Sequence, residues 1–120
     1  MPGRILLLLG TKKGAFILEG DAATRGDWLL RGPFCDAWPV MHAVGDAADG
    51  TIWAGGGNEW FGPAVWRSTD RGTRWTHSSA GLSYGEGEPP IRAVWSLARA
   101  ADGALWAGVE PAGLFRSIDG

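Results

Sequence analysis

The chain has 120 residues, of which 45% are apolar and 20% charged, with 20 Gly, 7 Pro and 8 Trp. The length allows one ordinary domain, and the apolar fraction supplies material for a packed core, so disorder is not the default expectation. The net charge is −2, and neither sign is concentrated in one half, which disfavours nucleic acid as a partner because phosphate contacts need a basic face. The single cysteine excludes an internal disulfide framework.

The apolar run Ile5–Leu9 is the first predicted element. It is too short for a membrane-spanning helix, which needs about 20 residues. It is also shorter than the apolar region of a signal peptide, which spans about 7–15 residues. We therefore expect a buried strand, no membrane partner and a cytoplasmic location.

An internal repeat organises the remainder of the sequence. Residues 49–55 (DGTIWAG) recur at 102–108 (DGALWAG), and residues 65–70 (VWRSTD) recur at 114–119 (LFRSID). A weaker copy opens the chain at 7–10 and 14–17. The period of about fifty residues is typical of propeller blades.

Each repeat contains short apolar runs bounded by Gly or Asp-Gly, which predict strands. The expected strands are 40–44, 51–55, 64–68 and one starting near 74–76, then 91–97, 104–108 and 114–117. Four antiparallel strands in about fifty residues make one propeller blade. The predicted fold class is therefore all-β: a partial β-propeller of antiparallel four-stranded blades at approximately 4–30, 39–78 and 91–120, the last incomplete. A small β-sandwich with repeated hairpins is the alternative.

One turn motif has the spacing Ser-x-Asp-x-Gly-x-x-Trp, formed by Ser68, Asp70, Gly72 and Trp75. A hydroxyl and a carboxylate two residues apart can accept hydrogen bonds from the backbone of a tight turn, and glycine supplies a backbone conformation that other residues resist. Ser117 and Asp119 begin a second copy.

This motif resembles the Asp-box, or BNR, repeat of sialidase-like (glycosyl-hydrolase-like) β-propeller proteins, and the resemblance covers essentially the whole chain. The segment 9–18 resembles the first blade of a bacterial group of such proteins. Members of the family are normally much longer. We therefore interpret the chain as the N-terminal fragment of a single propeller domain, whose partners would be the remaining blades or further copies of itself.

The resemblance implies that the Asp-box residues are structural, because their turn lies at the periphery, away from the ligand face. That assignment covers Ser68, Asp70, Gly72, Trp75, Ser117 and Asp119. The ligand face is expected at the opposite connections and along the first strand of each blade, where an offset of 53 aligns His42 with Trp95. The ligand-binding candidates are Trp38, His42, Asn58, Glu59, Trp60, Tyr84, Glu86, Arg92 and Trp95. A solvated loop and a core histidine are the structural alternatives.

Two functions follow from the resemblance. The first is a scaffold or a module that binds a glycan or protein ligand, with no complete catalytic site in this chain. The alternative is the N-terminal part of a sialidase-like exo-glycosidase with catalytic residues partly in other blades. The Arg-Ile-Pro segment typical of those enzymes is absent, since Leu6 follows Arg4 and Ile5. We expect no cofactor and no metal, because His42 and His77 lack metal-ligand spacing.

Overall fold

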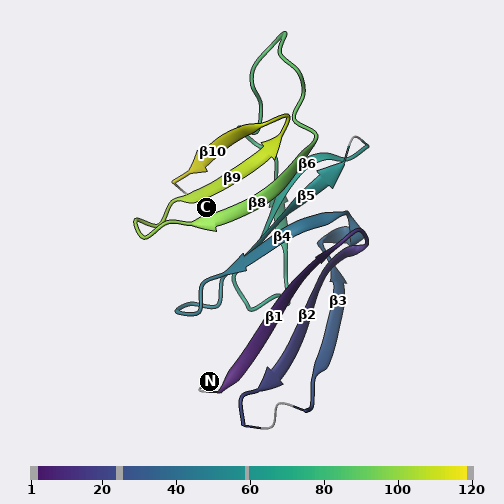
Figure 1. Ribbon diagram of the computed structural model, residues 1–120, viewed down its shortest axis with the longest axis vertical. Helices are drawn as coiled ribbons and strands as arrows, with labels where there is room; N and C mark the ends of the chain where they lie inside the picture. The colour runs from purple at the N-terminus through teal and green to yellow at the C-terminus, as the bar shows by residue number, and fades with distance from the viewer. Residues whose placement is uncertain (1–2, 24–25, 59, 119–120) are drawn as a thin grey trace.

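The computed structural model describes residues 3–23, 26–58 and 60–118, and they form three antiparallel sheets with no α-helix (Figure 1). The first sheet contains β1 (Arg4–Thr11), β2 (Gly14–Asp21) and β3 (Leu29–Phe34). The second contains β4 (Val40–Gly45), β5 (Ile52–Asn58), β6 (Gly62–Ser68) and β7 (Thr76–Ser78). The third contains β8 (Ala93–Arg99), β9 (Leu105–Glu110) and β10 (Gly113–Ser117). A 3₁₀ turn, η1 (Cys35–Ala37), joins the first two sheets.

The all-β prediction is confirmed, and every strand expected from the second and third repeats is present. Only the second sheet has four strands, and within the described residues the three sheets do not close into a ring. The first sheet extends to Phe34, beyond the expected boundary at residue 30. In the same part of the chain, no helix has the length and apolar character needed to cross a membrane.

The sheets pack face to face: β1 adjoins β4 at the first junction, and β4 and β5 adjoin β8 at the second (Figure 1). Each junction between neighbouring sheets encloses an apolar core. The core at the first junction consists of Ala15, Cys35, Val40, Ala54, Ala64 and Trp66. The core at the second junction consists of Trp53, Ile91, Val94, Leu97, Leu105, Ala107 and Val109.

β1 occupies the place in the first sheet that β5 occupies in the second. A Cβ added at Gly10 would lie 2.7 Å from the carbonyl oxygen of Val40 on β4, and one added at Gly55 would lie 2.6 Å from Cγ1 of Val94 on β8. The first sheet therefore lacks a counterpart of β4, and no described strand pairs with the outer edge of β1. The expected strand is present but it is not buried: Leu7 is 45% exposed and Leu9 39%.

Candidate functional site

The turn 68–75 is held together by its own side chains. Oδ1 of Asp70 accepts hydrogen bonds from the Ser68 hydroxyl (2.8 Å) and from the backbone N–H groups of Thr73 (3.0 Å) and Arg74 (2.8 Å). The Trp75 indole N–H donates to the carbonyl oxygen of Gly72 (2.9 Å). The Arg74 N–H, then the Ser68 hydroxyl, lower the pKa of Asp70. The carboxylate is thus engaged within its own turn, as the motif predicts.

This turn packs against the first sheet. Nη2 of Arg31 donates to the carbonyl oxygen of Arg71 (2.9 Å), and the Cα of Gly72, at a φ of 92°, faces the side chain of Ile17. Ser117 ends β10 at the position equivalent to Ser68, whereas Asp119 lies outside the described residues. Ser68 and Ser117 therefore lie at the strand ends away from η1, whereas the Trp75 ring reaches Phe34, the residue that precedes η1.

The other end of the sheets gathers the connections on which the ligand-binding candidates lie. We call it the connection end: it comprises η1, the β5–β6 turn, the segment 79–92 and the β9–β10 turn (Figure 1). The Gly57 N–H donates to the carbonyl oxygen of Pro39 (2.9 Å), which ties the β5–β6 hairpin to the segment after η1. The Arg92 N–H donates to the carbonyl oxygen of Glu110 (2.7 Å), which ties segment 79–92 to β9.

Trp38 and Tyr84 both support a neighbouring aromatic side chain. Trp38 meets Trp66 edge to face at 5.6 Å between ring centroids and stacks on Phe61 at 4.4 Å. Tyr84 lies 5.6 Å from Phe115, the repeat equivalent of Trp66, and its hydroxyl donates to the carbonyl oxygen of Pro111 (2.6 Å). These two candidates therefore serve packing at equivalent positions of two sheets.

Of the remaining loop candidates that the structure describes, Trp60, Glu86 and Arg92 are exposed and Asn58 is half-buried. Oδ1 of Asn58 accepts hydrogen bonds from the N–H groups of Trp60 (3.0 Å) and Phe61 (2.9 Å), so the amide shapes the hairpin turn. The Trp60 side chain is 87% exposed, and Glu86 and Arg92 also face solvent. Glu59 lies outside the described residues.

The expected alignment of His42 with Trp95 is wrong by one residue. β4 has a bulge between Val40 and His42, and β8 has one between Val94 and Ser96. His42 therefore corresponds to Ser96, and its Nδ1 accepts a hydrogen bond from the Leu97 N–H (2.9 Å), which links β4 to β8. The histidine has a structural contact of the kind that the core-histidine alternative describes.

The two bulge residues are Met41 and Trp95, and their exposed fractions are 51% and 55%. Met41 is not among the predicted site residues because the offset of 53, which aligns the later strands of the two repeats, does not hold for their first strands. The correct alignment is indicated by Val40 and Val94, which correspond only at an offset of 54. Both bulge residues lie near the start of their strands, at the connection end.

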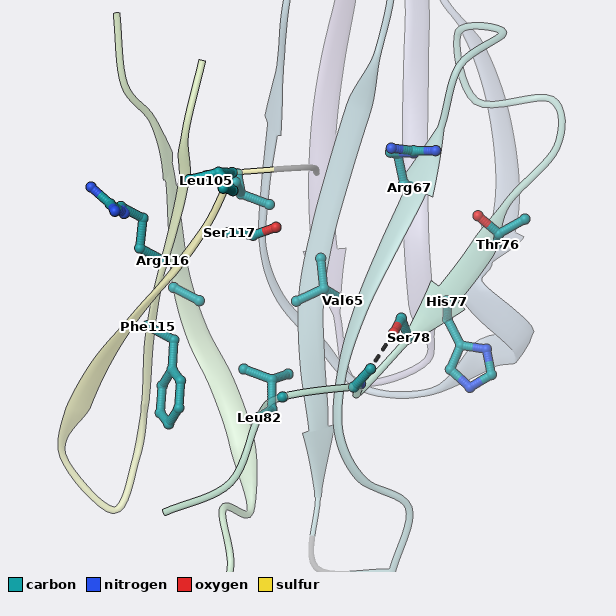
Figure 2. Close-up of a pocket in the computed structure, with 14 residues that line it drawn as sticks. Val65, Arg67, Thr76, His77, Ser78, Leu82, Leu105, Phe115, Arg116 and Ser117 are labelled. Atoms are coloured by element: carbon teal, nitrogen blue, oxygen red, sulfur yellow. Dashed lines mark hydrogen bonds between the residues drawn. The ribbon is translucent and has the colours of Figure 1, made fainter. Parts of the chain in front are cut away.

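Two hollows lie between the sheets. The larger, with a volume of about 570 Å³, separates β6 and β7 from β9 and β10 (Figure 2). Its apolar lining includes Val65, Leu82, Leu105, Ala107 and Phe115, and we call it the outer groove. Among the predicted site residues that the structure describes, only Ser117 lines it. The smaller, of about 490 Å³, lies beside η1 and is lined by Phe34, Cys35, Trp66, Trp75 and His77 among others.

Within residues 3–23, 26–58 and 60–118, no group of three or more His, Cys, Asp or Glu side chains is placed to hold a metal ion. No protein-family model matches this sequence, and no curated protein is significantly similar to it.

Proposed function

We propose that this chain is part of a β-propeller of the Asp-box (BNR) type and that it binds a glycan at the connection end. Two observations support the propeller. The fifty-residue repeats form successive antiparallel sheets that pack through β1, β4, β5 and β8. The Ser68–Trp75 turn has the internal hydrogen bonds that its spacing predicts.

The matched bulges in β4 and β8 carry the functional proposal. A β-bulge re-aims a side chain, and bulges are frequent beside binding and active sites. Here they leave the large apolar side chains of Met41 and Trp95 more than half exposed on neighbouring strands. Burial of such side chains stabilises a sheet, so their exposure at two equivalent places favours a role in binding.

A sugar ring is the ligand that this surface suits best. An indole face is flat and apolar while its N–H edge is polar, and this combination matches a pyranose, which has an apolar C–H face and polar edges. The exposed guanidinium of Arg92 lies three residues before Trp95 and supplies hydrogen-bond donors to hydroxyl or carboxylate groups. We therefore assign sugar stacking to Trp95 and polar contacts to Arg92.

Binding is favoured over hydrolysis by the contacts of two residues. Tyr84 is the single tyrosine of the sequence, and its hydroxyl is hydrogen-bonded to the backbone at Pro111, so it is not placed as a nucleophile. Asp70 has a lowered pKa, whereas a general acid at neutral pH needs a raised one. Both observations concern this chain alone and favour a binding module.

The proposal is tested by glycan-array screening of the 120-residue chain, followed by calorimetric titration of the best ligand. We expect Trp95→Ala to weaken binding about tenfold or more. The control is Leu29→Ala, since Leu29 is 60% exposed on β3 of the first sheet, which carries neither of these two bulges. Unchanged affinity in Trp95→Ala would refute the site, and turnover of a fluorogenic sialoside would support the glycosidase instead.

A further inference from the structure

The β5–β6 turn is longer than the equivalent turn of the third sheet. Gly55 pairs with Val65 across the turn, and the two are ten residues apart in the sequence. The equivalent pair, Gly108 and Leu114, is six residues apart. The insertion lies between two strands that pair along their length, at the connection end (Figure 1). It is therefore a feature of the second repeat itself.

The backbone of this turn is held at three places. Oδ1 of Asn58 accepts hydrogen bonds from the N–H groups of both Trp60 (3.0 Å) and Phe61 (2.9 Å). The Phe61 ring stacks on Trp38, with 4.4 Å between centroids and 11° between planes. The Gly57 N–H donates to the carbonyl oxygen of the residue that precedes β4 (2.9 Å). The turn is therefore already ordered, so little ordering cost remains when a ligand binds to it.

The Trp60 side chain is the part of this turn that packs least. It is 87% exposed, the highest exposed fraction of any large apolar side chain that the structure describes. Single exposed apolar side chains are common and need no function. This one differs because Asn58 and Phe61 fix the backbone beside it while the indole itself faces solvent. A rigidly mounted, exposed indole is suited to anchor a ligand.

The strand register places Trp60 well beyond the side chains assigned to sugar stacking. Gly56 pairs with Val40, the residue before Met41, so Met41 lies near the level of Gly56. Asn58 is two residues further along β5, about 7 Å at the rise of an antiparallel strand, and Trp60 lies past it. The backbones of Met41 and Trp60 are therefore about 10 Å apart along the strand direction. One sugar ring does not span this separation, whereas several linked sugars do.

From these observations we infer that the connection end binds a linear glycan along several of its sugar units, with Trp60 stacking on a unit beyond the one that Trp95 holds. The inference rests on the proposed glycan binding and adds a second contact to it. Met41, which is 51% exposed, offers apolar surface to the chain between the two indoles. Both indoles present a flat apolar face with a polar edge, which suits pyranose rings of one chain. The ligand class is therefore an extended oligosaccharide and not a single terminal sugar.

The test uses a glycan array that carries homopolymer series of one to six sugar units, probed with the complete 120-residue chain. We expect the apparent affinity of the native chain to rise about tenfold or more from one unit to six. In Trp60→Ala a single sugar should bind as it does to the native chain, but the rise with length should be lost. Trp60→Phe is the matched control, since it keeps an aromatic ring and should retain the rise.

Further variants separate this inference from the proposed function. Trp95→Ala should weaken binding at every length, because it removes the contact that all lengths share. Asn58→Ala keeps the indole but releases two N–H groups of the turn, and it should weaken the binding of long chains only. Leu29→Ala, on the first sheet, should change neither. Circular dichroism confirms that each variant folds.

A native affinity that does not depend on length would overturn the inference, even where Trp95→Ala shows that glycan binding itself stands. An equal loss in Trp60→Ala at every length would overturn it too, because Trp60 would then share one contact with Trp95. Dimers of the native chain that Trp60→Ala dissociates would assign the indole to an interface between copies. Absence of binding to any arrayed sugar would refute the proposed function and this inference together.

Discussion

A single carboxylate oxygen, Oδ1 of Asp70, organises the turn 68–75. Oδ1 of Asp70 accepts three hydrogen bonds, and the Ser68 hydroxyl, which is one of the donors, also accepts from the Gly72 N–H (2.8 Å). Hydrogen bonds to an ionised acceptor are stronger than those between neutral groups. The turn therefore holds Trp75 against the first sheet with two short polar side chains.

Replacing Asp70 by alanine is expected to lower the melting temperature, because three hydrogen bonds are lost and two backbone N–H groups must find water. Thr69→Ala is the matched control: it truncates an exposed side chain in the same turn and should leave the melting temperature unchanged. Thermal unfolding followed by circular dichroism measures both. Equal melting temperatures of Asp70→Ala and the native chain would contradict this structural role.

We also expect the difference in melting temperature between the native chain and Asp70→Ala to depend on pH. The folded-state pKa of Asp70 lies below its ordinary value of 3.8, so its contribution to stability is present above that value and is lost as the pH falls through the folded pKa. The difference in melting temperature between the native chain and Asp70→Ala should be constant near neutral pH and shrink below about pH 3.8.

At the level of elements, the His42 side chain joins β4 to β8 by a hydrogen bond. The Leu97 N–H, in a residue that is 3% exposed, finds its acceptor in Nδ1 of His42 across the junction between the two sheets. The bulge at Met41 re-aims the strand so that the imidazole faces β8. The bulge thus serves both the packing of the sheets and the exposure of Met41.

His42→Ala is expected to destabilise the chain by about 1–3 kcal/mol, since a buried N–H would lose its acceptor. Denaturant unfolding measures the change, and hydrogen exchange of the Leu97 amide should accelerate at the same time. Ser96→Ala, at the equivalent position of β8, is the control, and we expect a change within about 0.5 kcal/mol. A His42→Ala variant as stable as this control would show that the bond carries no stability.

The strands were predictable from sequence because each is a local pattern bounded by Gly or Asp-Gly. The contacts within the turn 68–75 were predictable for the same reason, since their partners are within a few residues of one another. The exposure of Leu7 was not, because burial depends on a neighbouring strand that the local sequence does not specify. The outer groove was missed because Val65, Leu82 and Phe115 come from distant segments.

The molecule as a whole is an elongated stack of 54 × 31 × 21 Å with strand edges at both ends. The edge of β1 is eight residues long, and its exposed side chains include Leu7 and Leu9. Long apolar edges of this kind pair with other chains unless charges or proline interrupt them. The edge of β1 is therefore an exposed apolar surface on which another chain can pair.

We therefore expect the 120-residue chain to associate in solution, and the double variant Leu7→Lys/Leu9→Lys to shift it toward the monomer. Size-exclusion chromatography with light scattering measures the mass. Ala47→Lys/Ala101→Lys adds the same charge at exposed turn positions and should not change the association. A native chain that is a monodisperse monomer, stable by more than about 5 kcal/mol, would contradict this expectation.

Cys35 lies in η1, between the first two sheets, and its reactivity reports separation of these sheets. Its side chain is 2% exposed, and burial, followed by the charge of Asp36, raises the pKa of the thiol to about 12. The thiolate that reacts with alkylating reagents is therefore scarce as long as the junction stays closed. Alkylation of this one sulfur reports how often the first sheet separates from the second, and it does so without any introduced label.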